Sequence, residues 1–457
     1  MLQIINPAHG GVIAEIAEDT HESVIAKYRA ARAAQPAWAQ TRLATRLAAI
    51  GRFREGVAAS LERLAAVLTS EVGKPIRQSR NELNGLLGRI DFFLAQSEAA
   101  LAPRTVHDEG GMREVIDLAP LGVIANISAW NYPWFVGSNV FVPALIAGNA
   151  VLYKPSEYAT LTGLEIGKLL HGSGIPQDIF SVVVGGGRVG IELLKEPVDG
   201  VFFTGSYPTG RRIAEAVAPR MIKLQLELGG KDPSYVCEDV DVAAAAASLA
   251  DGAMYNTGQS CCSVERIYVH ASIFDAFVAA FVKEVQGFKV GEPTDESTYI
   301  GPLTRAQQVK LLQMQVADAV AKGAKLRVGG QPLTERPGGH WFAPTVLVNV
   351  DHDMAVMREE SFGPIIGIQA VADDAEAVRL MNDTDYGLTA GVYTRSEARA
   401  RTILSQVHAG SVYWNCCDRV SPRLPWSGVK HSGLGLTLST EGITAFTRPK
   451  AWHLRTA

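Results

Sequence analysis

The chain has few cysteines, no long hydrophobic run and little excess charge. Five cysteines among 457 residues are too few for a disulfide framework. No run of about 18 apolar residues is present that could cross a bilayer. The first residues show no basic segment followed by an apolar one, as a secretory signal would. We therefore expect a cytoplasmic protein with reduced thiols and no membrane partner.

The charge balance excludes a second group of functions. Lys and Arg number 43 and Asp and Glu number 47, so the formal net charge is −4. A dedicated nucleic-acid binder needs a basic field, so we expect no nucleic-acid partner. Hydrophobic residues make up 47% and charged residues 20%, as in ordinary folded domains.

The order of the expected elements indicates an α/β fold. Residues 20–102 are expected to be helical, because Ala, Leu and Arg recur there at helical spacing. Short apolar strands alternate with helices over residues 150–228, and a second such series extends over residues 264–414. Within the second series, residues 291–302 and 329–344 are expected to be loops. This alternation is typical of right-handed βαβ units around a mainly parallel sheet.

One cysteine has neighbours that suit a nucleophile. In Gly258-Gln259-Ser260-Cys261-Cys262, small residues leave room for a thiol to meet a substrate. A buried cysteine acting as a small hydrophobe is the alternative. Two adjacent cysteines do not chelate one metal comfortably, and no CxxC or HxxxH pattern is present, so we expect no metal site.

Two polar residues could assist such a thiol. Glu227 lies in an apolar strand before two glycines, where apolar surroundings could raise its pKa for work as a general base. A solvated edge-strand glutamate is the alternative. The Asn131 amide could hold a developing oxyanion, whereas a turn or helix cap is its ordinary role.

Three further segments have the chemistry of a nucleotide-binding edge. Residues 205–210 follow a strand and open a helix, where backbone N–H groups could meet a pyrophosphate. Lys154 and Glu157 follow another strand, and the carboxylate could accept hydrogen bonds from a ribose. Glu360 lies near Phe362 at a tight turn. A plain turn or a solvated surface remains the alternative for each segment.

Taken together and in order, these segments resemble the aldehyde dehydrogenase superfamily over nearly the whole chain. The separation of 34 residues between Glu227 and Cys261 (261 − 227) is typical of that family's glutamate and cysteine. The matching pieces are Pro120-Leu-Gly, Trp130-Asn-Tyr-Pro, Lys154-Pro-Ser-Glu, Phe203-Thr-Gly-Ser, Leu226-Glu-Leu-Gly-Gly-Lys, Gly258-Gln-Ser-Cys, Glu360-Ser-Phe-Gly-Pro, Leu424-Pro-Trp-Ser-Gly and Lys430-His-Ser-Gly-Leu-Gly.

The resemblance implies an NAD(P)-dependent, non-acylating aldehyde dehydrogenase. By that resemblance Cys261 forms a thiohemiacetal and then a thioester, Asn131 holds the oxyanion, and Glu227 activates the water that releases a carboxylic acid. Because Glu157 would bind the 2′-hydroxyl and repel a 2′-phosphate, we expect NAD to be preferred, with NADP possible. The implied cofactor contacts are Trp130, Lys154, Glu157, Gly187, Ser206, Glu360 and Phe362.

The resemblance also implies three structural parts. A Rossmann-like cofactor domain would comprise residues 1–103 and 121–229, and an α/β catalytic domain residues 230–431. A small β oligomerisation element would comprise residues 104–120 and 432–457. Its edge strands would be unpaired in a monomer, so we expect a homodimer or homotetramer.

The substrate positions depart from those of related enzymes for short dicarboxylic semialdehydes. Those enzymes usually carry an Arg six positions before the nucleophile and another eight positions after the Asn, where this chain has Tyr255 and Asn139. A carboxylate tail would lose that clamp. We expect an aromatic or medium aliphatic aldehyde, with a semialdehyde or a cationic aminoaldehyde as alternatives. The expected aromatic entrance consists of Trp134, Phe135, Tyr255 and Trp426.

Two other classes stay open at this point. A non-catalytic NAD-binding structural protein could keep the fold, although it would have no need of Cys261, Glu227 and Asn131 together. A cysteine hydrolase would need a histidine base, and the ten histidines, His270 among them, lie in no recognisable triad context.

Overall fold

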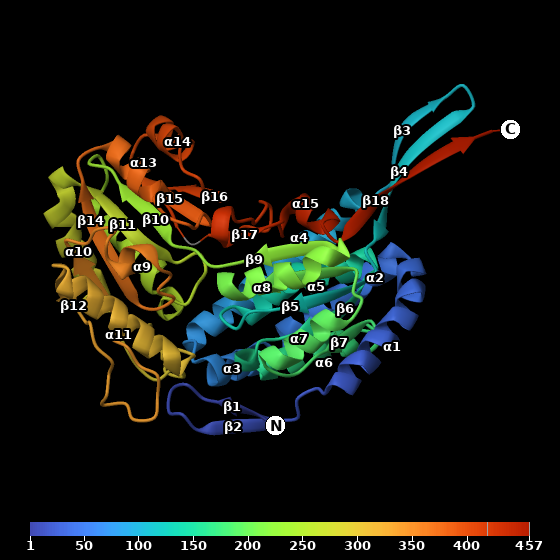
Figure 1. Ribbon diagram of the computed structural model, residues 1–457, viewed down its shortest axis with the longest axis horizontal. Coiled ribbons are helices and arrows are strands. Elements are labelled where there is room, and N and C mark those ends of the chain that lie inside the picture. Colours follow the sequence, from blue (N-terminus) through green and yellow to red (C-terminus); the bar gives the residue numbers. More distant parts are fainter. Residues whose placement is uncertain (418, 457) are drawn as a thin grey trace.

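The computed structural model describes residues 1–417 and 419–456. Two α/β lobes lie side by side (Figure 1). A β-arm of three strands, formed by segments within residues 104–120 and 447–455, projects away from one of them. Within the described residues, no helix combines the length and the apolar composition needed to span a bilayer.

The first lobe is built on a six-stranded sheet with the order β17-β9-β8-β5-β6-β7. All neighbouring strands are parallel except β17, which runs antiparallel to β9. The expected mainly parallel sheet is thereby confirmed. The strands are β5 (Val123–Ile127), β6 (Ala150–Lys154), β7 (Phe180–Val182), β8 (Gly200–Thr204), β9 (Lys223–Glu227) and β17 (Gly433–Leu434). The helices between them are α5 (Pro133–Ala147), α6 (Thr160–Gly172), α7 (Gly187–Lys195) and α8 (Tyr207–Val217).

The N-terminal region is helical, as its composition predicts. A capping box of Thr20 and Ser23 starts the first helix, and Gly73 ends the third in the left-handed conformation at φ 78°. The four helices are α1 (His21–Gln40), α2 (Leu43–Ala59), α3 (Leu61–Val72) and α4 (Ile76–Ala100). Helices α2 and α4 pack on α5. A hairpin of β1 (Leu2–Ile5) and β2 (Val12–Ile16) precedes them and was not predicted.

The second lobe has a seven-stranded sheet with the order β12-β13-β14-β11-β10-β15-β16. Only β12 is antiparallel to its neighbour. The strands are β10 (Asp232–Val236), β11 (Val264–His270), β12 (Lys325–Val328), β13 (Thr345–Val348), β14 (Ile365–Val371), β15 (Thr389–Tyr393) and β16 (Ser411–Trp414). The helices are α9 (Val242–Met254), α10 (Phe274–Gly287), α11 (Ala306–Ala321), α12 (Ala355–Arg358), α13 (Asp374–Asn382) and α14 (Glu397–Leu404).

The C-terminal segment corrects the expected domain boundary at residue 432. Strand β17 extends the first sheet, and α15 (Ser439–Thr444) packs on α4 and α5. The apolar side chain of Phe446 is buried in the first core, where the centroid of its ring lies 4.6 Å from that of Phe202. Only β18 (Thr447–Arg455) joins the β-arm, beside β4 (Met112–Pro120) and β3 (Arg104–Glu109).

Candidate active site

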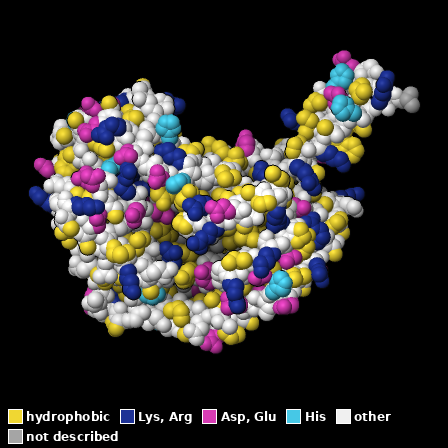
Figure 2. All heavy atoms as spheres, viewed as in Figure 1, with side chains coloured by type: hydrophobic (Ala, Val, Ile, Leu, Met, Phe, Trp, Pro, Cys, Tyr) yellow, Lys and Arg dark blue, Asp and Glu magenta, His cyan; other side chains and the backbone are white. Residues whose placement is uncertain are grey.

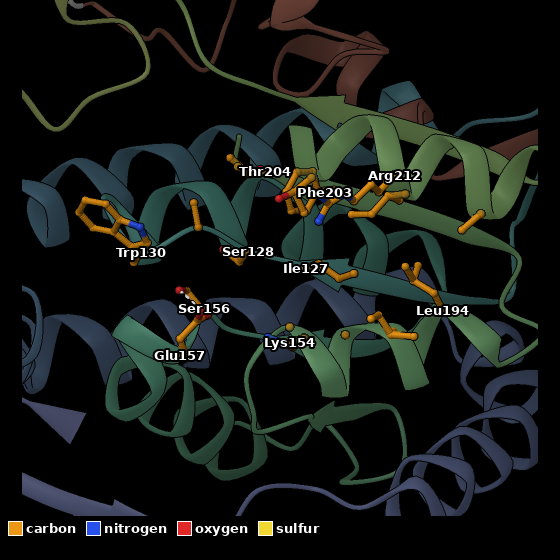
Figure 3. Close-up of a pocket in the computed structure, with 18 of the residues that line it drawn as sticks. Ile127, Ser128, Trp130, Lys154, Ser156, Glu157, Leu194, Phe203, Thr204 and Arg212 are labelled. Atoms are coloured by element: carbon orange, nitrogen blue, oxygen red, sulfur yellow. Dashed lines mark hydrogen bonds between the residues drawn. The ribbon is translucent and has the colours of Figure 1, made fainter. Parts of the chain in front are cut away.

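A cavity of about 830 Å³ opens where the strands of the first sheet reach their carboxyl ends. Figure 3 shows Trp130 at one end and Leu194 at the other, with Lys154 and Glu157 along one side and Phe203 opposite. Lys154 is the last residue of β6 and is 4% exposed, and burial lowers its pKa. The cavity has a volume in the range of cofactor sites and polar groups that suit a dinucleotide.

Two helix N-termini lie at this edge of the sheet. Gly187, the first residue of α7, lines the large cavity. Ser206 is the N-cap of α8 and donates a hydrogen bond to Thr209 Oγ1 at 3.2 Å. Backbone N–H groups at such ends favour an anion. Arg212 also lines the cavity, but it belongs to no motif that could have identified it from the sequence.

A smaller cavity of about 160 Å³ continues from the large one. The two share Ala129, Trp130, Thr204 and Gly205. The small cavity brings together seven residues expected at the site: Trp130, Asn131, Ser206, Glu227, Cys261, Glu360 and Phe362. Arg305 and Gln308 also line it and were not predicted.

A tight turn presents Cys261 to this cavity. Asn256, Thr257 and Gly258 have left-handed φ values of 54°, 58° and 69°. A Cβ at Gly258 would lie 2.2 Å from the carbonyl oxygen of Gly363, so only glycine fits there. The turn leaves Cys261 partly exposed, whereas Cys262 is buried.

Hydrogen bonds tie Asn131 to the segment that carries the thiol. Its Nδ2 donates to the Gln259 carbonyl oxygen at 3.2 Å. Asn256 Nδ2 donates to the Asn131 carbonyl oxygen at 3.2 Å and to that of Gln259 at 3.0 Å. Asn131 therefore lies beside the cysteine turn, just before α5 begins at Pro133.

Glu227 ends β9 with its carboxyl group almost enclosed. The side chain is 7% exposed, and its Oε1 accepts from Thr437 Oγ1 at 3.2 Å. Its Oε2 has no hydrogen-bond partner among the described residues. Burial raises the pKa of Glu227 to about 8. A carboxyl group with one free oxygen and this pKa can exchange a proton near neutral pH.

A buried ion pair fixes the turn that carries Glu360. Lys231 Nζ lies 2.6 Å from a Glu265 oxygen, and both side chains are almost fully buried. Glu265 accepts hydrogen bonds from the N–H groups of Ser361 at 2.8 Å and Phe362 at 2.9 Å. The pair thus holds the turn at the edge of the small cavity.

Glu360 itself lies against the glycines that follow β9. Its Oε1 accepts from the Gly230 N–H at 3.2 Å. A Cβ at Gly229 would lie 2.3 Å from the same oxygen, so a larger residue there would displace the Glu360 carboxyl group. Loss of solvent, reinforced by the nearby Glu265 charge, raises the pKa of Glu360 to about 8. The Phe362 ring meets that of Trp130 edge-on at 5.5 Å.

A third cavity of about 580 Å³ lies on the other side of the cysteine turn, where Ser260 and Cys262 line it. Phe135, Tyr255 and Trp426, three of the four residues predicted for a substrate entrance, line it. Trp134 does not. The side chain of Trp134 is fully buried in the first core, because its position on α5 faces inward. Its backbone N–H donates to Glu82 Oε1 at 2.9 Å. The expected role of Trp134 is therefore wrong.

The third cavity is more polar than the predicted aromatic entrance. Arg89, Asn139, Asp251, Arg419 and Arg423 line it together with the aromatic side chains. Arg89 Nη1 donates to Asn139 Oδ1 at 2.9 Å. Helix α4 thereby places a guanidinium beside position 139, where related semialdehyde enzymes usually have an arginine and this chain has an asparagine. No local motif marks Arg89.

Comparisons with known proteins agree with this geometry. The profile described as "Aldehyde dehydrogenase family" matches residues 1–452. The chain is 37% identical to 3,6-anhydro-alpha-L-galactose dehydrogenase from Streptomyces coelicolor, over 100% of this chain and 93% of that protein. It is 36% identical to a putative succinate-semialdehyde dehydrogenase [NADP(+)] from Mycolicibacterium smegmatis, over 96% and 86%. The solved structure of PnpE in complex with nicotinamide adenine dinucleotide superposes with a TM-score of 0.96, at 32% identity over 99% of this chain and 94% of that one.

The chain belongs to the aldehyde dehydrogenase family. It is an NAD(P)-dependent oxidoreductase that acts on an aldehyde. This membership argues against the structural NAD-binding protein and the cysteine hydrolase considered from the sequence.

Proposed function

We propose that Cys261, Asn131 and Glu227 carry out the oxidation of the aldehyde to a free carboxylic acid. The observation that carries this assignment is that all three line one small cavity continuous with the dinucleotide cavity. The residues that would hold the dinucleotide are Lys154 and Glu157 at its adenosine ribose, the N-terminal ends of α7 and α8 at its phosphates, and Glu360 at the other ribose.

In the first step the Cys261 thiolate adds to the carbonyl carbon, which places a negative charge on the carbonyl oxygen. Asn131 Nδ2 and the Cys261 backbone N–H donate hydrogen bonds to that oxygen, and one such donor is worth roughly 3 kcal/mol in the transition state. When bound, NAD(P) supplies the acceptor for the hydride that leaves the carbon as the C–O double bond re-forms. The product on the protein is a thioester at Cys261.

In the second step Glu227 takes a proton from water, and the resulting hydroxide attacks the thioester carbon. The C–S bond breaks, the carboxylic acid leaves, and the Cys261 thiolate is restored. Glu227 acts in its ionised form, so its raised pKa makes this step faster as pH rises toward about 8.

We further propose that the enzyme prefers NAD and forms a homodimer or homotetramer through the β-arm. Glu157 lines the dinucleotide cavity, where a carboxylate favours a ribose hydroxyl over a phosphate. The outer edge of β18 has no strand partner among the described residues. The named relatives act on different aldehydes, so relatedness alone does not identify the substrate.

The test is NADH formation by the purified protein with a panel of aldehydes. We expect Cys261→Ser to abolish turnover and the matched variant of its neighbour, Cys262→Ser, to retain it. Full turnover by Cys261→Ser, or equal loss in both variants, would remove the proposed nucleophile.

A further inference from the structure

One buried cation lines the third cavity, and no carboxylate in the described part of the chain pairs with it. Arg89 is 6% exposed, and its Nη1 donates to Asn139 Oδ1 at 2.9 Å. Its Cζ lies 3.8 Å from the centroid of the Phe135 ring. Among the described residues, no Asp or Glu oxygen lies within 4.0 Å of the Arg89 guanidinium.

Other buried arginines in the protein are used differently. Arg266 is fully buried and donates to the carbonyl oxygens of Lys231, Leu380 and Met381 and to a tyrosine hydroxyl. Arg46 is 8% exposed and donates only to backbone carbonyl oxygens. A guanidinium has five N–H donors, and Arg89 has one protein acceptor in the described part of the chain.

Leaving a buried cation with so few acceptors is costly unless a ligand completes its hydrogen bonds. Burial lowers the pKa of Arg89 to about 10, so the group is still charged at neutral pH. The Phe135 ring lies against the guanidinium, with its centroid 3.8 Å from Cζ, so the N–H donors that Asn139 does not engage are left for a partner in the cavity. Two parallel N–H donors match the two oxygens of a carboxylate.

Most of the other charged side chains that line the cavity are also cationic. Arg419 and Arg423 are exposed and line its outer part. Asp251 is the single acidic residue among its described lining residues. Counted over these described residues, three arginines against one aspartate give an excess of two positive charges, which attracts an anion and repels a cation.

We propose that Arg89, held in place by Asn139 and Phe135, binds the carboxylate of an aldehyde substrate that Arg419 and Arg423 attract from solution. This proposal rests on the proposed function and names its substrate class, a carboxylated aldehyde. Ser260 and Cys262 line the same cavity, so the bound carboxylate lies beside the turn that carries Cys261. Aromatic side chains contact the carbon chain, and the cationic groups provide the selectivity.

The first experiment compares kcat/KM for succinate semialdehyde with that for butanal, the same chain without the charge. We expect the semialdehyde to be preferred, and the preference to fall about 10- to 100-fold in Arg89→Met, with partial recovery in Arg89→Lys. Arg80→Gln is the matched control, because Arg80 lies on the same helix and pairs with exposed Glu62 and Glu296. It should keep the wild-type ratio.

A second readout needs neither cofactor nor turnover. Iodoacetate and iodoacetamide alkylate the same thiol but differ in charge, and peptide mass spectrometry gives the rate at Cys261 for each. We expect Arg89→Met to lower the iodoacetate-to-iodoacetamide rate ratio. Equal slowing by both reagents would show that Arg89 acts on the thiol, which would overturn the proposal.

The outcomes separate the two proposals. Two results together would overturn the carboxylate assignment and leave the oxidation intact. The wild type would prefer butanal, the cation betaine aldehyde or a phosphorylated aldehyde over succinate semialdehyde, and Arg89→Met would leave the ratio of kcat/KM values unchanged. If no aldehyde is oxidised but the alkylation ratio still falls in Arg89→Met, the anion site stands and the proposed function fails.

Discussion

Glu82 accepts a hydrogen bond from the backbone N–H of Trp134 at 2.9 Å, three residues beyond the candidate oxyanion donor Asn131. The same carboxylate forms a fully buried ion pair with Lys74. The Lys74 ammonium also lies 3.7 Å from the centroid of the Tyr132 ring. Helix α4 therefore positions the start of α5, and with it Asn131, through one buried charge pair.

Replacing Glu82 with Gln tests this positioning. The amide oxygen can still accept from Trp134, but the Lys74 ammonium loses its carboxylate. We expect the free energy of unfolding to fall by about 3 kcal/mol, as when one partner of a buried pair is removed. Urea denaturation measures it. The control Glu62→Gln removes an exposed carboxylate from its pair with Arg80 and should cost under about 1 kcal/mol. Equal effects of both variants would contradict the account.

The raised pKa of Glu227 predicts a pH-dependent rate. The carboxyl group is neutral below about 8 and ionised above it, so hydrolysis of the thioester should accelerate as pH rises through that value. The pH profile of kcat under conditions where hydrolysis limits turnover should show this midpoint, and Glu227→Gln should flatten it at a much lower rate. A profile that is level from about pH 6 to about pH 9 would rule out Glu227 as the base.

The same shift predicts a trend in stability. The folded state holds a proton on Glu227 that the unfolded chain releases near its ordinary pKa of 4.5. The stabilisation is therefore complete below that value and is lost as pH rises through about 8. The melting temperature of Glu227→Gln relative to wild type should increase between about pH 6 and about pH 9. A constant difference would mean that the carboxyl group is not desolvated.

Glu157 makes the cofactor preference testable. Exchanging its carboxylate for an amide in Glu157→Gln removes the repulsion of a 2′-phosphate and weakens the hold on a 2′-hydroxyl. We expect wild type to prefer NAD in kcat/KM, and the variant to shift the NAD-to-NADP ratio toward NADP by about tenfold, close to the value of one charge-assisted hydrogen bond. Equal or better kcat/KM of wild type with NADP would show the expectation to be wrong.

The local parts of the site could be predicted from the sequence, because short motifs determine them. Cys261, Glu227 and Asn131 each lie in a short segment whose glycine or amide residues could be recognised in the sequence. The structure places all three in one cavity. The mainly parallel sheets followed from the alternation of apolar strands and helices. Domain boundaries that depend on packing between distant segments could not be predicted from the sequence, as the burial of Phe446 in the first core shows.

The substrate side depended on contacts between distant elements. Arg89 meets Asn139 across 50 residues of sequence, and neither lies in a motif that indicates the other. Trp134 was expected at the entrance because it is aromatic, but the phase of α5 buries it. A one-residue difference decides whether a helical side chain faces a core or a cavity, which explains why Phe135 lines the cavity and Trp134 does not.

The central claim is that a covalent thioester forms at Cys261 and is hydrolysed through Glu227. Intact-protein and peptide mass spectrometry of Glu227→Gln, mixed with NAD and succinate semialdehyde or butanal, tests it most directly. We predict an added mass equal to the acyl group on the peptide that contains Cys261, present in Cys262→Ser/Glu227→Gln and absent in Cys261→Ser/Glu227→Gln. An adduct that persists without Cys261, or turnover of Glu227→Gln at the wild-type rate, would contradict the account.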